Sequence, residues 1–326
     1  MSAPIKVVVF GATGRIGRVV IDGLIRSPTK FEIVAVSRPS SIDKPQNVWF
    51  RENGVTVVGL EINGPREHLV DVIKGADVVF ATINQNALEH QKILIDMCKD
   101  FGVGRFIPDA FGPVMPPVGA MSIRDAKEKY FNYMKLKRVP YTVIDVAWWY
   151  QVLPYKVPSG RGDHMIPFGP GDANRIPGDG NIRVSLSDVN SVGDKVARII
   201  VDPRTINKYV HVYDEVFTHH QMVQILEDVS HEKVERVYKT AQDYQDSIAE
   251  MNKLLAEDPS NHQALIGLVM ADSQVSLSVR GDSTPEVAEY LGYLDVYQLY
   301  PDLKPSRLRD YYQRALDGKE KPTYTN

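Results

Sequence analysis

A short apolar run leads directly into a glycine-rich turn, and the turn opens a helical pattern. The run is Ile5–Phe10, and residues 11–17 after it read GATGRIG. Strands buried on both faces of a sheet are apolar and β-branched, as this run is. A strand followed by glycines and a helix directs backbone N–H groups and the helix N-terminus at one point, which suits a pyrophosphate. The sequence therefore predicts a dinucleotide site at this turn.

The residues around the turn complete a βαβ unit. Apolar residues follow at helical spacing to about residue 27, and a second apolar run occupies residues 32–36. The unit takes about 30 residues, which is the context that supports a dinucleotide-binding fingerprint. The glycines are spaced G-x-x-G-x-x-G, a form that suits extended short-chain dehydrogenases. The alternative interpretation is a tight strand-to-helix turn without a ligand.

The end of the second strand distinguishes between the two nicotinamide cofactors. An NAD site carries an acidic residue there, about 20 residues past the glycines, that binds the ribose 2′-hydroxyl. Residues 36–41 contain no carboxylate and instead place Ser37 and Arg38 at this point. A guanidinium matches a phosphate with two donors, and Arg15 would cover the same phosphate or the adenine. We therefore predict NADP(H), with Lys44 as a weaker contact. The alternative is a solvated Arg38 in a surface loop.

Strand-like and helix-like runs alternate through the first half of the chain. Further strands are predicted at residues 55–60, 77–83, 105–108 and 141–146. Such alternation favours a parallel sheet with helices on both faces and ligands at the carboxyl ends of the strands. The predicted fold class is α/β, a Rossmann-type doubly wound parallel sheet with a smaller, mostly helical substrate lobe. The residues predicted to bind NADP(H) are Gly11, Thr13, Gly14, Arg15, Ile16, Gly17, Ser37, Arg38, Thr82 and Lys127.

The pattern changes after about residue 153. Residues 154–180 are rich in proline and glycine and are predicted to be irregular, and a strand at 209–213 would return the chain to the first sheet. We therefore predict an NADP-binding domain at 1–153, rejoined by about 182–215, and a discontinuous substrate-binding lobe within 154–326. Helices are predicted at residues 189–201, 218–229, 242–257, 285–291 and 306–316.

Composition argues against several classes of function. The 326 residues carry a net charge of −3, without a basic patch of the kind that binds nucleic acid. No stretch is apolar over a membrane-spanning length, and no targeting signal stands at the N-terminus. The single cysteine, Cys98, fits a reducing compartment. We predict a cytoplasmic monomer or homodimer that binds a small-molecule substrate, no nucleic acid and no membrane. No metal-ligand motif occurs, so no metal is predicted.

A lysine between the fifth and sixth strands is the main catalytic candidate. Ser122 and Asp125 have the spacing of a capping box, so a helix is predicted from there to about Lys137. In a parallel sheet this helix begins on the cofactor side, which places Lys127 in its second turn, near the nicotinamide. There it would act as a general acid or base, and its ammonium would hold the nicotinamide ribose. The alternative is a surface lysine in a turn rich in lysine and glutamate.

A second lysine matches the Y-x-x-x-K string of short-chain dehydrogenases. Tyr133 and Lys137 have this spacing, but Lys137 lies about 15 Å beyond Lys127 along the helix. That is the end of the helix away from the cofactor, so the match is interpreted as chance. The position four residues before Lys127 is Ile123. The usual tyrosine–lysine pair is therefore absent.

Two segments at strand ends are assigned to the substrate side. Asp109 follows the fifth strand and would be a general acid or base, a substrate anchor, or a cap for the next segment. Trp148, Trp149 and Tyr150 follow the sixth strand, where they would line a pocket for a large flat or polycyclic substrate. For at least one of these three, plain core packing is the alternative.

Several segments together resemble the NmrA-like and isoflavone-reductase-like branch of atypical short-chain dehydrogenases over nearly the whole chain. The resemblance implies NADPH-dependent reduction of phenylpropanoid-derived compounds in plant-type members, and their catalytic lysine falls on Lys127. Family members often have serine after the proline of the fifth strand, where this chain has Asp109. The matching segments are the glycine turn, Ser37-Arg38, the helix with Gln91, and residues 102–112, 139–142, 178–180, 280–282, 290–293 and 299–302.

We predict an NADPH-dependent oxidoreductase that acts on a sizeable aromatic or polycyclic specialised metabolite, with Lys127 as the general acid or base. Two alternatives stay open. One is an NADP(H)-bound isomerase or rearrangement enzyme without net redox change, which the missing tyrosine and the unusual Asp109 allow. The other is an NADP-sensing regulator without turnover, as some family members are. The sequence does not name the substrate or the direction of reaction.

Overall fold

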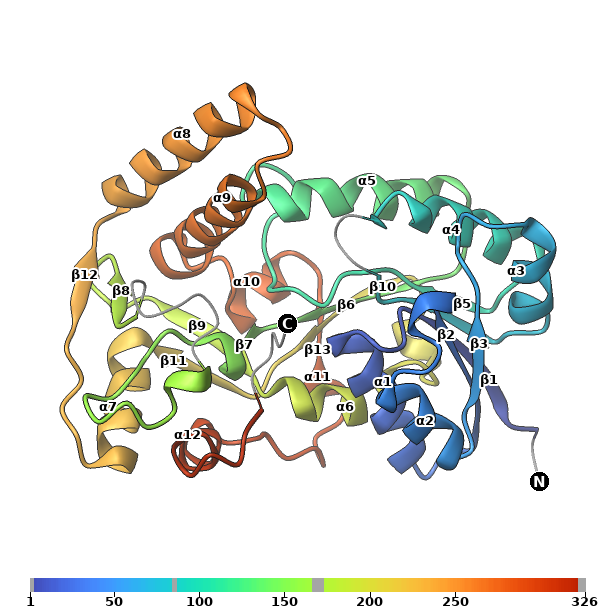
Figure 1. Ribbon diagram of the computed structural model, residues 1–326, viewed down its shortest axis with the longest axis horizontal. Helices are drawn as coiled ribbons and strands as arrows, with labels where there is room; N and C mark the ends of the chain where they lie inside the picture. Colours follow the sequence, from blue (N-terminus) through green and yellow to red (C-terminus); the bar gives the residue numbers. More distant parts are fainter. Residues whose placement is uncertain (1–2, 84–86, 166–172, 322–326) are drawn as a thin grey trace.

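A five-stranded parallel sheet forms the N-terminal half of the molecule (Figure 1). The computed structural model describes residues 3–83, 87–165 and 173–321. The strand order β3-β2-β1-β4-β5 reverses between β1 and β4, so the carboxyl ends of these two strands form the crevice where ligands bind in such sheets. The strands are β1 (Ile5–Phe10), β2 (Phe31–Ser37), β3 (Thr56–Gly59), β4 (Val78–Ala81) and β5 (Arg105–Ile107).

Helices cover both faces of this sheet (Figure 1). One apolar core joins the strands to α1 and α6, and a second, on the opposite face, joins them to α3, α4 and α5. The predicted doubly wound α/β fold is therefore confirmed. The helices are α1 (Arg15–Arg26), α2 (Pro45–Glu52), α3 (Arg66–Ile73), α4 (His90–Asp100), α5 (Ser122–Leu136) and α6 (Val192–Ile199).

Helices α1 and α6 touch backbone to backbone. A Cβ built on Gly23 would lie 2.1 Å from the carbonyl carbon of Gly193, and one on Gly193 would lie 2.0 Å from the carbonyl oxygen of Val19. Real Cβ atoms do not approach so closely, so both positions must be glycine for the helices to pack at this distance.

The sheet continues through strands contributed by distant parts of the chain. Strand β6 (Thr142–Val146) begins beside β5, where Phe106 and Tyr141 form a parallel bridge. Strands β10 (Lys208–Val212) and β13 (Leu294–Asp295) then extend it in the order β13-β10-β6. The chain thus returns to the first sheet after α6, as the apolar run at residues 209–213 predicts. The exact domain boundaries stay a prediction.

A lobe with its own apolar core occupies the other end of the molecule. It contains one sheet in the order β11-β9-β7 and a two-stranded sheet of β12 and β8. The strands are β7 (Trp148–Trp149), β8 (Arg175–Pro177), β9 (Arg183–Ser187), β11 (Glu215–Thr218) and β12 (Val237–Lys239). Its helices are α7 (His219–Ser230), α8 (Ala241–Glu257), α9 (His262–Gln274) and α12 (Leu308–Leu316). Helix α11 (Val296–Leu299) packs against the core of the first sheet, and α10 (Pro285–Tyr290) contacts β13.

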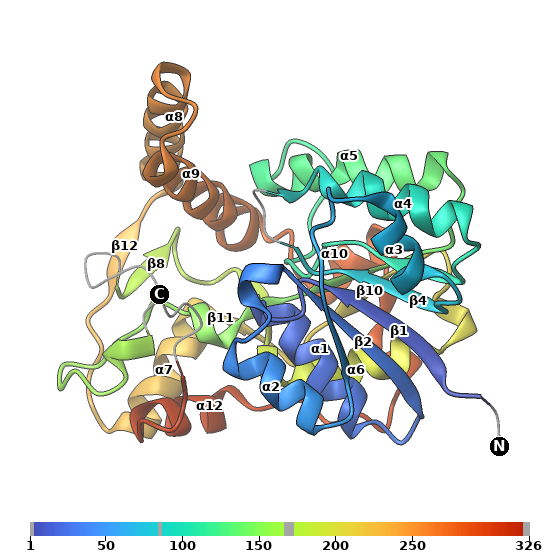
Figure 2. The ribbon, with the colours of Figure 1, turned by 45° about the vertical axis from the view of Figure 1, so that its right-hand side comes forward.

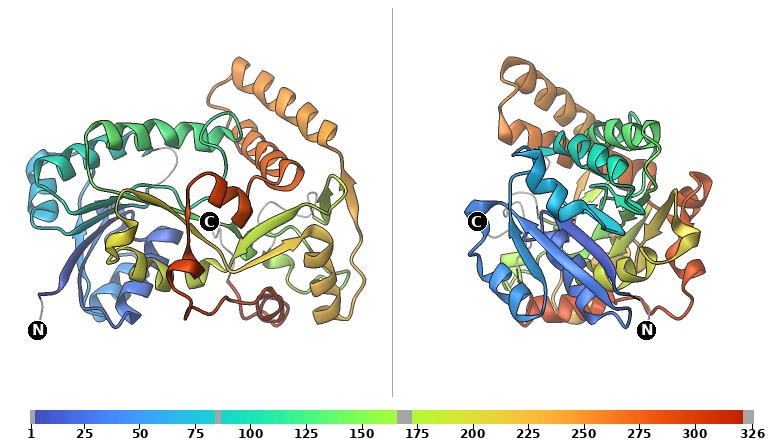
Figure 3. Two further views of the ribbon diagram at one scale, coloured as in Figure 1. Left: turned by 180° about the vertical axis from the view of Figure 1, so that it is seen from behind. Right: turned by 90° about the vertical axis from the view of Figure 1, so that its right-hand side faces the viewer.

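Helices α8 and α9 form a hairpin that stands out beyond the rest of the lobe in every view (Figures 2 and 3). A π-helical segment, Val275–Arg280, continues α9 toward the small sheets. Short 3₁₀ helices occupy Pro39–Ser41, Tyr150–Val152, Asp163–Met165, Val189–Ser191 and Pro203–Thr205. Among the residues described, no helix combines the length and the apolar character needed to cross a bilayer.

The predicted capping box at the start of α5 is wrong, although the helix does begin at Ser122. Met121 is the N-cap residue, and its side chain caps nothing. The Asp125 carboxylate accepts a hydrogen bond from the Gly119 N–H, and the Ser122 N–H donates to Asp272 of α9. Helices α2 and α9 and the small lobe strands have no counterpart among the predicted elements. Part of the segment predicted to be irregular, residues 166–172, lies outside the described residues.

Candidate active site

The glycine turn after β1 is closed so tightly that side chains would not fit. Gly11 has a φ of +79°, and a Cβ on it would lie 2.1 Å from the carbonyl oxygen of Thr82. A Cβ on Gly17 would lie 2.4 Å from the carbonyl oxygen of Gly11. The Thr82 hydroxyl donates to the Phe10 carbonyl at 2.8 Å and fixes β4 against the turn. Thr82 therefore supports the turn from behind.

The N-terminus of α1 has no side-chain cap. Gly14 is the N-cap residue, so no side chain caps the helix, and its first turn contains no acidic residue. The first N–H groups of a helix have no partner within the helix. They can therefore bind an anion, which the helix dipole also attracts. Thr13 is half-buried in the turn, and Ile16 packs against the core beneath α1.

Two predicted cofactor contacts lie at the end of β2, of which Ser37 is buried and Arg38 is exposed. The Ser37 hydroxyl donates to Asn47 at 3.2 Å, and the Asn47 amide donates to the Ser41 carbonyl at 2.8 Å. These bonds hold the loop after β2 in shape. Arg38 is exposed, and its guanidinium has no hydrogen-bond or ion-pair partner within the described part of the chain. Its charge is thus available at the rim of the turn.

Arg15 points from the glycine turn toward the lobe. One terminal nitrogen donates to the Asn190 side chain at 3.2 Å, while Nε is buried without a partner among the described residues. Burial lowers the pKa of this guanidinium, and Arg18 adds to the effect. Since a buried donor without a partner costs about 1–3 kcal/mol, this position favours an anionic or polar ligand.

Lys127 and Asp109 meet at the carboxyl end of β5. The lysine Nζ lies 3.2 Å from Asp109 Oδ2, and the two side chains are only 14% and 12% exposed. Nζ also donates to the Ala110 carbonyl at 2.7 Å. The Asp109 carboxylate therefore contacts Lys127 and does not cap the backbone of the next segment.

Asp109 is held by the helix that precedes it. Its N–H donates to the side-chain oxygen of the fully buried Gln91 on α4, at 2.9 Å. Burial raises the pKa of the Asp109 carboxyl, and the neighbouring Lys127 ammonium opposes that rise. The site therefore pairs a buried acid with a cation, an arrangement that can hold or move a proton.

Tyr133 and Lys137 lie at the other end of α5. Lys137 is the C-cap residue, and both side chains contact Asp96 of α4, the lysine at 2.8 Å. This cluster is partly exposed and lies outside the group formed by Lys127 and Asp109. Its surface position accounts for these residues without any role in chemistry.

The three aromatic residues after β6 face different surroundings. Trp148 lines a cavity in the lobe, whereas Trp149 packs against the core beneath the sheet. Tyr150 is fully buried, and its hydroxyl donates to Glu215 at 3.1 Å and to the Ser306 carbonyl at 3.0 Å. The structure gives Tyr150 a packing role, so the prediction that it lines the pocket is wrong for that residue.

The cavity has a volume of about 530 Å³ and lies between the α8–α9 hairpin and the segment after β6. Most of its walls are apolar, as in small-molecule sites. Helix α9, which forms one wall, is attached to the start of α5 because the Ser122 N–H donates to Asp272 at 2.7 Å. The lining residues are Trp148, Val152, Pro154, Arg175, Tyr244, Ser247, Met251, Gln263, Ile266, Gly267, Met270, Ala271 and Gln274.

Most of this lining is absent from the candidates drawn from sequence, because α9 is not among the predicted helices. One signal for α9 is present. Asn261 follows Pro259 and Ser260 and precedes an apolar run, and its side chain accepts the Ala264 N–H as an N-cap. Asparagine before an apolar run is a helix-start signal.

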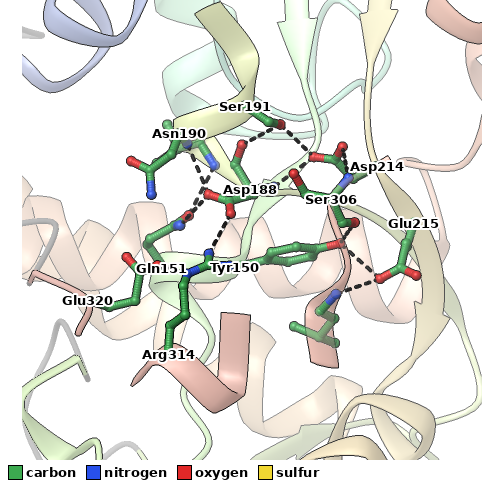
Figure 4. Close-up of polar contacts among 12 residues, drawn as sticks. Tyr150, Gln151, Asp188, Asn190, Ser191, Asp214, Glu215, Ser306, Arg314 and Glu320 are labelled. Carbon is green, nitrogen blue, oxygen red and sulfur yellow. Dashed lines mark hydrogen bonds and ion pairs between the residues drawn. The ribbon is translucent and has the colours of Figure 1, made fainter. Parts of the chain in front are cut away.

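A buried polar network connects the glycine side to the lobe (Figure 4). The Asp188 carboxylate accepts hydrogen bonds from Gln151 at 2.7 Å, from the Asn190 N–H at 3.0 Å and from Arg314 at 2.9 Å. The Asn190 side-chain oxygen in turn accepts a hydrogen bond from Arg15. The network therefore fixes the lobe relative to the helix that begins at the glycine turn.

Comparison with known proteins gives matches over nearly the full length. The model of the NmrA-like family matches residues 4–291. The asnovolin J 5′,6′-dehydrogenase of Aspergillus novofumigatus is 38% identical, with 98% of each chain covered. Eugenol synthase 1 of Petunia hybrida is 28% identical, covering 95% of this chain and 98% of the other. These similarities agree with the resemblance that the sequence motifs carry.

Solved structures share the fold. The leucoanthocyanidin reductase of Vitis vinifera, in a binary complex with NADPH, superposes with a TM-score of 0.79 at 20% identity, covering 96% of this chain and 99% of the other. An isoflavone reductase structure gives 0.77 at 22% identity, covering 96% and 99%. At this level of identity the superpositions establish the architecture.

Proposed function

The chain belongs to the NmrA-like family, and on that premise we propose that it is an NADP(H)-dependent oxidoreductase. Its substrate is a sizeable aromatic or polycyclic specialised metabolite, and Lys127 is the general acid or base. The observation that carries the proposal is the buried ion pair between Lys127 of α5 and Asp109, which directly follows β5, with Nζ 3.2 Å from Oδ2.

The cofactor part of the proposal rests on the glycine turn. The close approaches at Gly11 and Gly17 and the uncapped N-terminus of α1 suit a pyrophosphate. Arg38 would bind the 2′-phosphate, and Arg15 would cover the adenosine end. The reductase of Vitis vinifera that shares this fold is described as a complex with NADPH. When bound, NADPH supplies a hydride to the substrate.

Lys127 supplies or accepts the proton that accompanies hydride transfer. Its Nζ is anchored by the Ala110 carbonyl and by Asp109, which fixes its position and keeps a second proton-binding group beside it. The low exposure of both side chains excludes most water from the pair, so the proton remains with these groups. Asp109 would thus take the place beside the lysine that tyrosine holds in ordinary short-chain dehydrogenases.

The substrate part rests on the cavity of the lobe. Its volume of about 530 Å³ falls in the range of small-molecule sites, and Trp148 offers a flat face to a ring system. Relatives of this chain include phenylcoumaran benzylic ether reductases and a pinoresinol reductase. The relative of highest identity among those described above is named for dehydrogenation of asnovolin J.

Substitution of Lys127 tests the proposal. NADPH oxidation is first followed with a panel of aromatic and polycyclic ketones, enones and benzylic ethers that includes pinoresinol, to find a substrate for the wild type. Both Lys127→Met and Lys127→Arg should then lower turnover by about 10²–10⁴-fold, because arginine keeps the charge but does not release a proton. NADPH affinity, measured by calorimetry, should change little in Lys127→Arg.

Lys137→Met serves as the matched control because that lysine lies on the same helix but pairs with Asp96. It should leave turnover unchanged. Full activity in Lys127→Arg contradicts the acid–base role. A wild type that ignores NADPH, or strongly prefers NADH, contradicts the cofactor assignment. Product formation without a net change in nicotinamide absorbance would identify an isomerase instead.

A further inference from the structure

A chain of buried hydrogen bonds runs through the lobe and ends at the wall of the cavity. The Tyr155 hydroxyl bonds to Nδ1 of His219, and Nε2 of His219 bonds to the Ser278 hydroxyl at 2.8 Å. The Ser278 hydroxyl donates to the Gln274 side-chain oxygen at 3.0 Å. Tyr155, His219 and Ser278 are all buried, and Gln274 lines the cavity.

The donor and the acceptor in each hydrogen bond of this chain can be assigned from its buried end, Tyr155. The Tyr155 hydroxyl has no other hydrogen-bond partner among the described residues, so it must donate to His219 or leave its proton unsatisfied. Burial raises the pKa of this phenol, which keeps it a donor. Burial, with a smaller effect of His220, lowers the pKa of His219 to about 4, so the imidazole is neutral.

A neutral imidazole carries one N–H, so one ring nitrogen donates a hydrogen bond and the other accepts one. Nδ1 of His219 accepts from Tyr155, so the proton lies on Nε2 and is donated to Ser278. The Ser278 hydroxyl accepts this hydrogen bond and donates its single proton to the Gln274 side-chain oxygen. The Gln274 carbonyl oxygen is therefore engaged, and the amide group can only turn its NH₂ outward.

From this arrangement we infer that Gln274 is a specificity-determining residue that donates a hydrogen bond to a carbonyl or ether oxygen of a flat substrate bound against Trp148. The inference rests on the proposed function and names the group that the substrate must carry. Trp148 and Gln274 both line the cavity, and the Trp148 and His219 rings are 5.9 Å apart. The same cluster thus positions the flat surface and the donor.

Two other polar residues of the wall, Ser247 and Gln263, lack such preparation. The Ser247 hydroxyl donates to the Asp243 carbonyl within its own helix, and Gln263 is exposed near the start of α9. The amide orientation of Gln274 is set by Ser278, one turn further along the same helical segment, and through it by His219 and Tyr155 from two other segments. A donor fixed before binding loses little entropy when the ligand arrives.

The first test needs no ligand. NMR of the full chain, labelled with heavy nitrogen at histidine, reports which ring nitrogen of His219 carries the proton, and Tyr155→Phe assigns its signals. The expected result at neutral pH is a neutral ring protonated on Nε2. A proton on Nδ1, or on both nitrogens, overturns the inference because Gln274 would then not be forced to present its NH₂.

The second test uses flavanone and flavan, which differ in one carbonyl oxygen, with the protein saturated with NADP⁺. Calorimetry should show flavanone bound about tenfold more tightly than flavan, the value of one hydrogen bond. Gln274→Met should bring the two affinities together. Ser278→Ala, which frees the amide to rotate without touching the ligand, should reduce the discrimination partly. Gln242→Met, at an exposed residue of α8 outside the cavity lining, should leave it intact.

These outcomes separate the two proposals. Failure of NADP⁺ to bind the wild type contradicts the proposed function. Normal NADP⁺ binding with equal affinity for flavanone and flavan, or with no binding of either, overturns only the role of Gln274. Persistence of the tenfold preference in Gln274→Met does the same.

Discussion

The glycine turn (residues 11–17) and the polar network around Asp188 and Asp214 are held rigid by opposite means. At the turn, backbone atoms approach so closely that a Cβ on Gly17 would lie 2.4 Å from the Gly11 carbonyl. In the network, long polar side chains cross the interior, as where Lys195 of α6 and Asp214, which follows β10, pair at 2.5 Å while almost fully buried. The turn depends on the absence of side chains, and the network depends on hydrogen bonds and an ion pair between them. Substitutions should therefore fail for different physical reasons in the two regions.

The largest expected effect comes from leaving one buried charge of this network without its partner. Asp214 accepts from Lys195 at 2.5 Å, the Asp188 N–H at 2.9 Å, Ser191 at 3.0 Å and the Ser306 N–H at 2.8 Å. Lys195→Met should lower the free energy of unfolding by about 3–5 kcal/mol, since it leaves a buried carboxylate without its cation. Urea denaturation measures the loss.

The double substitution Lys195→Met, Asp214→Asn is the control for that experiment. It removes both charges but keeps a side-chain oxygen as acceptor for the Asp188 or the Ser306 N–H group, so it should restore part of the lost stability. A single variant that loses less than about 1 kcal/mol would contradict the burial argument and erase the contrast with the turn.

Two glycines of the turn should respond differently to one added methyl group. Gly17→Ala should cost about 1–3 kcal/mol of unfolding free energy, because its Cβ would also lie 2.9 Å from the Ala12 Cα. Gly14 is exposed at the N-cap, and its Cβ would lie 3.1 Å from the Gly11 carbonyl oxygen. Gly14→Ala should cost less than about 1 kcal/mol but weaken NADPH binding. Calorimetric titration and thermal unfolding separate the two effects, and equal stability losses would contradict the assignment.

The smallest expected effect is a pH-dependent one in the lobe. Arg236, the Val234 N–H and Lys233 bond to the buried Glu227 carboxylate, and these partners lower its pKa to about 2 from 4.5. A depressed pKa stabilises the fold above about pH 4.5, and this contribution is lost as the pH falls toward 2. Glu227→Gln should therefore cost about 1 kcal/mol at neutral pH and progressively less near about pH 3. Denaturation curves at the two pH values test it; a constant difference would contradict it.

The sequence was sufficient for the sheet half because its signals are local. The run Ile5–Phe10 and the glycines after it determine a strand and a turn from neighbouring residues alone. The placement of Lys127 near the carboxyl end of β5 followed from the direction of a helix after a parallel strand. Its pairing with Asp109 did not, because periodicity does not report which side chains meet.

The lobe was harder to predict because its structure depends on distant partners. Strand β9 pairs with β11, and the start of α5 bonds to Asp272 from a helix 150 residues later in the chain. The apolar residues of α9 lie on several sides rather than along one stripe, so helical periodicity is weak there. The hydrogen-bonded chain to Gln274 also includes His219 and Tyr155 from two distant segments, which only the folded structure brings together.

The contact of Gly23 with Gly193 has a consequence for how such a protein can diverge. Because a methyl group at either residue would overlap main-chain atoms of the opposite helix, neither position can change first while the helices keep their separation. Any lineage that replaces one of them must also shift α1 or α6, and with it the segment leading back from the lobe. The pair therefore couples sequence change in α1, which begins at the glycine turn, to sequence change in the chain that returns from the lobe.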